Sequence, residues 1–251
     1  MNPLLHSVPA LLAWGMACTT TSALAQSLSP LVTPDGTAAS NWRFVGLPKS
    51  KADIPLTRFE LTGVQGERAL KVSTRASYGA WVHELPHAHP GLLQWRWRLD
   101  QPLTGGKVVA DIRTKAGDDA ALKVCVMFDH PLDRVPFVER TLLRIARSVS
   151  GENLPAATLC YVWDSVHPAG LQGANPYTQR VRFIALQGKG APLAQWQTEN
   201  RDLAADFAKL FADELPAGAA VPTVRAVLIG ADSDNTGAES VGWVKSIALT
   251  H

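Results

Sequence analysis

Residues 92–99 read Leu-Leu-Gln-Trp-Arg-Trp-Arg-Leu, and apolar side chains alternate with polar ones along them. Successive side chains of a β-strand point to opposite faces of its sheet. One face of this strand then carries four large apolar side chains, those of Leu93, Trp95, Trp97 and Leu99. The other face carries Gln94, Arg96 and Arg98. Such a strand has one face in a hydrophobic core, which is typical of the sheets of a β-sandwich.

Further runs with strand character follow this one and precede it at short intervals. They span residues 58–62, 69–73, 80–85, 121–128, 158–163, 180–186, 224–229 and 242–249. About nine short strands separated by turn signals indicate an antiparallel sandwich rather than a parallel sheet.

Two segments between these strands have helical rather than strand periodicity. The first spans residues 136–147, and Asn200 is the predicted N-cap of the second. In the second, apolar residues repeat at helical spacing: Leu203, Phe207, Leu210 and Phe211. The sequence therefore predicts a mainly β protein, an antiparallel, jelly-roll-like β-sandwich with two flanking α-helices.

The first 25 residues differ from the rest, because they contain no Lys, Arg, Asp or Glu and include the apolar run 8–17. The sequence Ala-Leu-Ala before Gln26 fits the small-x-small rule of signal cleavage, so we predict a signal peptide over residues 1–25. A lipoprotein signal at Cys18 is the alternative, although Gly15 stands where such a site has Leu.

An N-terminal arm over residues 26–55, rich in Ser, Pro, Thr and Gly, is predicted to precede one sandwich domain over residues 56–251. No later stretch approaches the ~20 apolar residues of a membrane span. We therefore predict an exported protein, periplasmic or secreted, with no transmembrane segment in the mature chain. The net charge of +2 is too small to indicate a nucleic-acid partner.

Cys125 and Cys160 follow the predicted signal peptide, and both lie in predicted strands. Export permits a disulfide between them. Two unlinked, buried apolar cysteines are the alternative, and the sequence leaves both interpretations open.

Residues 232–237 read Asp-Ser-Asp-Asn-Thr-Gly and lie between two predicted strands. Alternate oxygen-bearing side chains followed by glycine are typical of calcium loops, so Asp232, Asp234 and Thr236 are the predicted ligands of a Ca²⁺ ion. An EF-hand is excluded, because its twelfth position is Trp243 where a Glu is needed. A tight turn stabilised by Asp and Asn side chains is the alternative.

Asp118 and Asp119 head another predicted strand. If the fold brought one of them next to Asp232 or Asp234, the two carboxylates would suit a site for a hard cation. They would equally suit an acid/base pair in which mutual repulsion raises one pKa, as glycoside hydrolysis requires. Asp118, Asp119 and Asp234 are therefore the candidate catalytic residues.

Aromatic and polar side chains also predict a ligand site. Asn175 and Tyr177 belong to an Asn-Pro-Tyr sequence in a predicted loop, where an exposed ring could stack on a sugar while amides bond its hydroxyl groups. Arg96 and Arg98 either grip a polar ligand from the sheet or form surface ion pairs. The predicted ligand-binding residues are Arg96, Arg98, Asp119, Asn175, Tyr177 and Asn235.

Several segments, taken in order, resemble one protein family. They are Trp95–Arg98, Lys115–Ala121, Val126–Phe128, Tyr161–Trp163, Asn175–Tyr177, Trp196–Phe207 and Asp232–Thr236. Over residues 58–250 the chain resembles the bacterial proteins catalogued as domain of unknown function 3047. The resemblance implies a mostly exported bacterial family and no particular activity. Lys123 and Cys125 depart from the family pattern, which has Arg and an aromatic residue there, and Lys cannot bind a carboxylate in the two-pronged manner of Arg.

The sequence favours an exported, non-catalytic ligand-binding β-sandwich. The predicted ligand is a carbohydrate or another polyhydroxylated molecule, small or polymeric, and a structural calcium ion is predicted beside it. One alternative is a carboxylate-dependent, glycoside-hydrolase-like enzyme that uses Asp118 or Asp119 with an acid from residues 232–236. Another is an envelope scaffold or interaction module, which needs no site at all.

Overall fold

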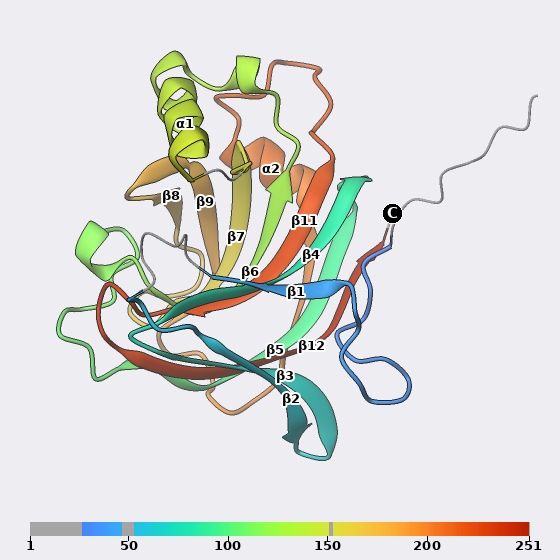
Figure 1. Ribbon diagram of the computed structural model, residues 1–251, viewed down its shortest axis with the longest axis vertical. Coiled ribbons are helices and arrows are strands. Elements are labelled where there is room, and N and C mark those ends of the chain that lie inside the picture. The colour runs from blue at the N-terminus through green and yellow to red at the C-terminus, as the bar shows by residue number, and fades with distance from the viewer. Residues whose placement is uncertain (1–26, 47–52, 151–152, 251) are drawn as a thin grey trace, which may run out of the picture.

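The computed structural model describes residues 27–46, 53–150 and 153–250. The predicted signal peptide and its alternative at Cys18 lie outside the described residues. Two β-sheets pack against each other, with the two α-helices at their margins (Figure 1). The predicted β-sandwich with two helices is confirmed.

The larger sheet has seven strands in the order β1-β4-β11-β6-β7-β9-β8. Their bounds are Trp42–Val45 (β1), Tyr78–Ala88 (β4), Val224–Asp232 (β11), Ala120–Phe128 (β6), Ala157–Trp163 (β7), Thr178–Gln187 (β9) and Gln172–Asn175 (β8). Strand β1 comes from the predicted N-terminal arm and pairs with β4. The strand pairs are antiparallel except β7 and β9, which run parallel.

The smaller sheet has five antiparallel strands in the order β10-β5-β12-β3-β2. Their bounds are Gln197–Asp202 (β10), Leu92–Thr104 (β5), Glu239–Thr250 (β12), Glu67–Arg75 (β3) and Arg58–Val64 (β2).

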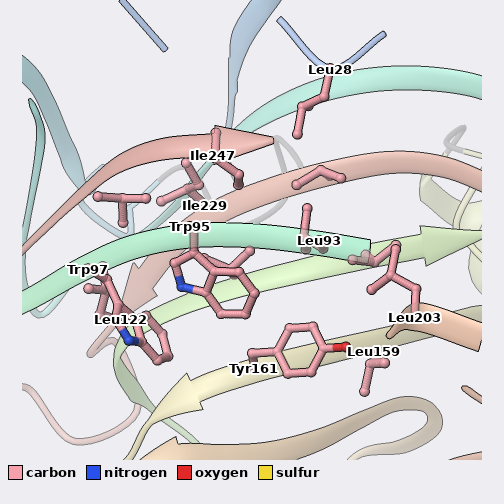
Figure 2. Packing of buried hydrophobic residues seen from close by; sticks show 14 of the residues in the cluster. Leu28, Leu93, Trp95, Trp97, Leu122, Leu159, Tyr161, Leu203, Ile229 and Ile247 are labelled. Atoms are coloured by element: carbon pink, nitrogen blue, oxygen red, sulfur yellow. The ribbon is translucent and has the colours of Figure 1, made fainter. Parts of the chain in front are cut away.

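The core lies between the two sheets, and β5 contributes its largest side chains (Figure 2). Leu93, Trp95, Trp97 and Leu99 are each at most 1% exposed. The Trp95 ring packs on Tyr161 with centroids 5.2 Å apart, and Trp97 packs on Trp163 at 5.4 Å. Because burial of one large apolar side chain contributes about 1.5–3 kcal/mol, this face of β5 provides much of the force that joins the sheets. The predicted alternation of this strand is confirmed.

Helix α1 spans Phe137–Ser150 and α2 spans Leu203–Leu210. The predicted N-cap of the second helix is wrong. Asn200 lies in β10, paired with Gln94, and Asp202 caps α2 by accepting a hydrogen bond from the Ala205 backbone N at 3.0 Å. Among the residues that the structure describes, no helix has the length and apolarity that crossing a membrane takes.

The outer face of the larger sheet carries the two cysteines. Cys125 of β6 and Cys160 of β7 are cross-strand partners and form a disulfide, which settles between the two alternatives. They belong to a second apolar cluster that includes Ile112, Val162 and Phe183. This face of the sheet is therefore partly covered by its own loops.

Candidate functional site

Three loops meet at the end of the larger sheet where β6 begins and β11 ends. They are residues 105–119, the β8–β9 turn and residues 233–238. The Asn175 side-chain amide donates to Asp118 Oδ2 at 2.6 Å, and the Asn235 amide donates to the Asp118 carbonyl at 2.9 Å. The structure thus brings the acids near 118 next to those near 234, as the proposed site requires.

A glycine determines where Asp118 and Asp119 lie. Gly117 ends the short 3-10 helix η2 (Lys115–Gly117), and a Cβ atom there would lie 2.4 Å from the Val109 carbonyl and 2.5 Å from the Asp111 amide. No side chain fits at that distance, so glycine at position 117 allows residues 109–111 to pack directly against the backbone of Gly117. The two acids are thereby held at the start of β6.

Asp119 is 3% exposed and binds the loop of residues 233–238. Its carboxylate accepts hydrogen bonds from the Thr236 amide at 2.8 Å, the Thr236 hydroxyl at 2.6 Å and the Asn235 amide at 3.3 Å. Thr236, a predicted metal ligand, therefore uses its hydroxyl to hold Asp119. These contacts give Asp119 a role in positioning the loop.

Asp232 binds the start of β6 and a buried cation. Its carboxylate accepts hydrogen bonds from the Ala120 amide at 2.9 Å and from Lys123 Nζ at 2.6 Å. Burial alone would lower the pKa of Lys123, but the charge and hydrogen bond of Asp232, together with the charges of Tyr78 and Asp118, outweigh burial and raise this pKa. Gly230 pairs with Lys123 across the strands, and a Cβ at Gly230 would lie 3.5 Å from the lysine Cε.

The sequence prediction did not include Lys123 among the site residues. The available signal was its position, since it is the single charged residue in the otherwise apolar strand AALKVCVMF. A charge in such a strand needs a buried partner. Lys123 makes a single-pronged contact with the Asp232 carboxylate, as expected of lysine.

Asp234 completes a group of three carboxylates. One oxygen each from Asp119, Asp232 and Asp234 lies within 4.8 Å of the others. Burial, followed by the charges of Asp232 and Asp119, raises the pKa of Asp234. Within the described part of the chain, no other residue donates a hydrogen bond to the Asp234 carboxylate. Hard oxygens at this spacing suit Ca²⁺, but Lys123 already supplies one positive charge, so the calcium ion stays a prediction.

Asp118 carries the largest upward pKa shift among these acids. Burial raises the pKa of Asp118 to about 6, although the hydrogen bond from Asn175 acts in the opposite direction. Burial likewise raises the pKa of Asp119. Between about pH 4 and pH 6, Asp118 is therefore protonated in the folded protein but ionised in the unfolded chain.

This difference predicts a pH-dependent stability with a definite sign. Because the folded pKa of Asp118 lies above its unfolded value, we expect the midpoint of thermal unfolding to fall as the pH rises from 4.5 to 7. Asp118→Asn should flatten this dependence and stabilise the protein at pH 7. Circular dichroism melts across this pH range measure the effect, with the exposed Asp133→Asn as the matched control. An Asp118→Asn variant with the wild-type slope would contradict the assignment.

Tyr177 lies beside this acidic group and is 57% exposed. Its hydroxyl donates to the Lys115 carbonyl at 2.8 Å, and its backbone N donates to Asn175 Oδ1 at 2.9 Å. Asn235 is also exposed. The fold thus gathers Asp119, Asn175, Tyr177 and Asn235, four of the predicted ligand-binding residues, around Asp118.

Arg96 and Arg98 are not part of this group. They lie on the outer face of the smaller sheet, because Trp95 and Trp97 occupy the inner face of the same strand. Arg98 Nε donates to Asp100 at 2.5 Å, and the Arg96 guanidinium lies 5.7 Å from the centre of the Trp196 ring. The structure does not bring these arginines together with Asn175, because they lie on β5 of the smaller sheet and Asn175 ends β8 of the larger sheet.

Comparison with solved structures finds a mutant of CBM29-2, a family 29 carbohydrate-binding module complexed with cellulohexaose. The two chains are 10% identical, the match covers 84% of this chain and 92% of the module, and the TM-score is 0.29. A TM-score this low does not bear on what this chain binds. Comparison with curated proteins finds no match. The family model described as "Protein of unknown function (DUF3047)" matches residues 40–248, and the chain therefore belongs to this family.

Proposed function

We propose that this protein is a non-catalytic ligand-binding domain whose ligand is a carbohydrate or another polyhydroxylated molecule. One observation carries the proposal. Asp118, Asn175 and Asn235, from three separate segments, are joined by hydrogen bonds beside the exposed Tyr177 ring. Each of these side chains is at least partly accessible, so a ligand could touch all of them.

The chemistry of these groups suits a sugar. An aromatic face packs on the C–H groups of a pyranose ring, and amides and carboxylates exchange hydrogen bonds with hydroxyl groups. The Asn175 carbonyl oxygen accepts from the Tyr177 amide and its NH₂ donates to Asp118, so the amide orientation is fixed before a ligand arrives. Preorganisation of this kind lowers the entropy cost of binding.

Burial of the other carboxylates supports a binding role over a catalytic one. Asp119 and Asp232 are almost wholly buried, and each accepts hydrogen bonds from the loops that it holds. A nucleophile or general acid must reach its substrate. Of the two remaining candidates, Asp118 and the half-buried Asp234, Asp118 favours the second function, a hydrolase, because a pKa of about 6 suits a general acid. Release of reducing ends from polysaccharides by wild-type protein, abolished in Asp118→Asn, would establish that alternative.

We further propose that the protein is exported. The Cys125–Cys160 disulfide supports this, since structural disulfides persist in oxidising compartments such as the periplasm and are rare in the cytosol. The mass of the chain recovered from the periplasm, with Gln26 as its first residue, checks both export and the predicted cleavage site.

The binding proposal predicts a specific loss in Tyr177→Ala. We expect the dissociation constant for the polysaccharide to rise at least tenfold, because the stacking ring is removed. A tenfold rise corresponds to a loss of about 1.4 kcal/mol of binding free energy. Affinity electrophoresis against neutral and acidic polysaccharides, with calcium or with chelator, identifies the ligand class. Titration calorimetry with the corresponding oligosaccharide then measures the change.

Two variants serve as controls for this loss. Tyr177→Phe keeps the ring but removes the hydrogen bond to Lys115, so it should bind nearly as wild type does. Phe137→Ala removes another exposed aromatic side chain, one in α1 that does not line the groove beside Tyr177, and should have no effect on the affinity. If no polysaccharide is retarded, or if Tyr177→Ala binds as well as wild type, the proposed site is wrong.

A further inference from the structure

Helix α1 exposes its apolar side chains instead of burying them. Phe137, Val138, Leu142, Ile145 and Val149 are between 56% and 83% exposed, whereas Leu143 is 6% exposed. In a surface helix of a globular protein the apolar stripe normally faces the core. Here most of the apolar residues face away from it, and the helix stands at one end of the molecule above β8 and β9 (Figure 1).

The side of α1 that faces the protein is polar except for Leu143. Glu139 pairs with Arg180 of β9 at 3.5 Å, and Arg147 Nε donates to the Leu154 carbonyl at 2.8 Å. Leu143 packs in a small cluster with Val135 and Ala156. The helix is thus fastened by polar contacts on one side, which leaves its hydrophobic side available.

The exposed stripe continues into an apolar hollow. A groove of about 330 Å³ runs between α1 and β9, and Leu142, Ala146, Pro155 and Val181 are among the residues that line it. Leu142 belongs to both surfaces. Contiguous apolar surface of this kind on a water-exposed protein marks an interaction site.

The segment that carries the stripe has a net positive charge, with Arg144 exposed and Arg134, Arg140 and Arg147 half-buried. Residues 132–149 contain four arginines and two acids, a net charge of +2, and Glu139 is already paired with Arg180. Arg144 is exposed one turn before Ser148 and beside Phe137 and Thr141 on the helix surface. An anionic partner therefore complements this helix better than a neutral or cationic one.

A second copy of the chain fits this surface poorly. A helix of 14 residues is about 21 Å long, and its exposed stripe offers a few hundred Å². A stable interface buries roughly 800 Å² on each partner. A bilayer surface needs no shape complementarity, and it accepts apolar side chains at acyl depth with arginines at the phosphates.

From these observations we propose that α1 docks the protein onto bilayers that contain anionic phospholipid. Phe137, Val138, Leu142, Ile145 and Val149 enter the interface between headgroups and acyl chains. Arg144 binds the phosphates, and the apolar groove lies against the same surface. Tyr177 also lines this groove, so the docking surface adjoins the candidate sugar site, but the exposed stripe of α1 contains neither Tyr177 nor Asp118.

The test is flotation of the purified protein with vesicles of phosphatidylcholine, either alone or with 30% phosphatidylglycerol. We expect at least tenfold stronger partitioning onto the anionic vesicles at low salt, and a clear loss at high salt. Leu142→Asp and Ile145→Asp should each reduce this binding at least tenfold. Arg144→Gln should reduce it about fivefold, as one arginine contributes about 1 kcal/mol at an anionic surface. All three positions are exposed, so these variants should fold.

Leu193→Asp is the matched control, because Leu193 is a comparably exposed leucine in the loop between β9 and β10. It should bind vesicles as wild type does. Equal binding of wild type and Leu142→Asp would overturn the proposal, as would absence of vesicle binding. Equal binding to neutral and anionic vesicles would overturn the role of the arginines. Sedimentation gives the remaining outcome. If the wild type is a dimer that Leu142→Asp dissociates, and neither binds vesicles, then the partner of α1 is a second copy of the chain and not a bilayer.

Discussion

Replacing Glu214 by Gln is expected to cost about 3–5 kcal/mol of the free energy of unfolding. The Glu214 side chain is fully buried, and its carboxylate accepts hydrogen bonds from Arg180 at 2.5 and 2.7 Å and from Arg182 at 2.9 Å. His130 Nε2 lies 3.1 Å from the same carboxylate. Loss of the negative charge leaves the buried guanidinium groups of Arg180 and Arg182 with only their more exposed partners, Glu139 and Asp213, and removing one member of a buried ion pair is costly.

The pH dependence of this contribution has the opposite sign to that of Asp118. Burial would raise the pKa of Glu214, but hydrogen bonds from Arg180 and His130 and the charges of both arginines lower it to about 2. A carboxyl group with a depressed folded pKa stabilises the fold above its unfolded pKa, and this stability is lost as the pH falls through the folded pKa. The wild type should therefore lose the stability that Glu214 contributes between about pH 4.5 and pH 2. Glu214→Gln should show no such loss, because it has no carboxyl group to protonate at this position.

Urea unfolding at pH 7 measures the first effect, and urea unfolding repeated at decreasing pH measures the second. Glu84→Gln is the matched control, because Glu84 pairs with Arg43 at 2.6 Å but both side chains are more than half exposed. Removal of an exposed pair should cost no more than about 1 kcal/mol. Similar losses in both variants would show that the buried network does not contribute as described.

The sequence predicted the sheets best where alternation in one strand forces a burial pattern. In β5 the alternating tryptophans and arginines have only one arrangement that buries the large rings, and the structure has it. Strand β10 was missed because its residues, Gln197–Asp202, are polar throughout. It lies at the edge of the smaller sheet, where backbone pairing with β5 rather than side-chain burial holds it. For the same reason the helix cap was placed at Asn200, two residues too early.

The candidate site was predictable in its composition and less so in its geometry. The sequence marked both acidic segments, and the fold brings them together through Asp119 and Asn235. It could not indicate which oxygen would bind which donor, because Lys123 and Asp119 are 109 and 117 residues away from their partners Asp232 and Thr236. The arginines of β5 were grouped with Asn175 on residue type alone. Which sheet each strand joins decides such groupings, and strand order depends on contacts between distant segments.

Removal of the Cys125–Cys160 disulfide is expected to cost about 2–4 kcal/mol of the free energy of unfolding. The bond links neighbouring strands of the larger sheet and closes a loop with a sequence separation of 35 residues, which contains α1. Without the bond, the unfolded chain gains the conformational freedom of that loop. Cys125→Ala and the double variant with Cys160→Ala should lose about the same amount, because either change breaks the link.

Reductant distinguishes the cross-link from the packing of the two side chains. Both cysteines are buried in the apolar cluster on the outer face of the larger sheet, so alanine also removes some van der Waals contact. Dithiothreitol removes only the bond, and it should lower the unfolding midpoint of the wild type in urea. It should leave the double variant unchanged. A wild type that keeps its midpoint after complete reduction would mean that the strand pairing of β6 and β7 holds this region without the covalent link, and the stabilisation attributed to the disulfide would be wrong.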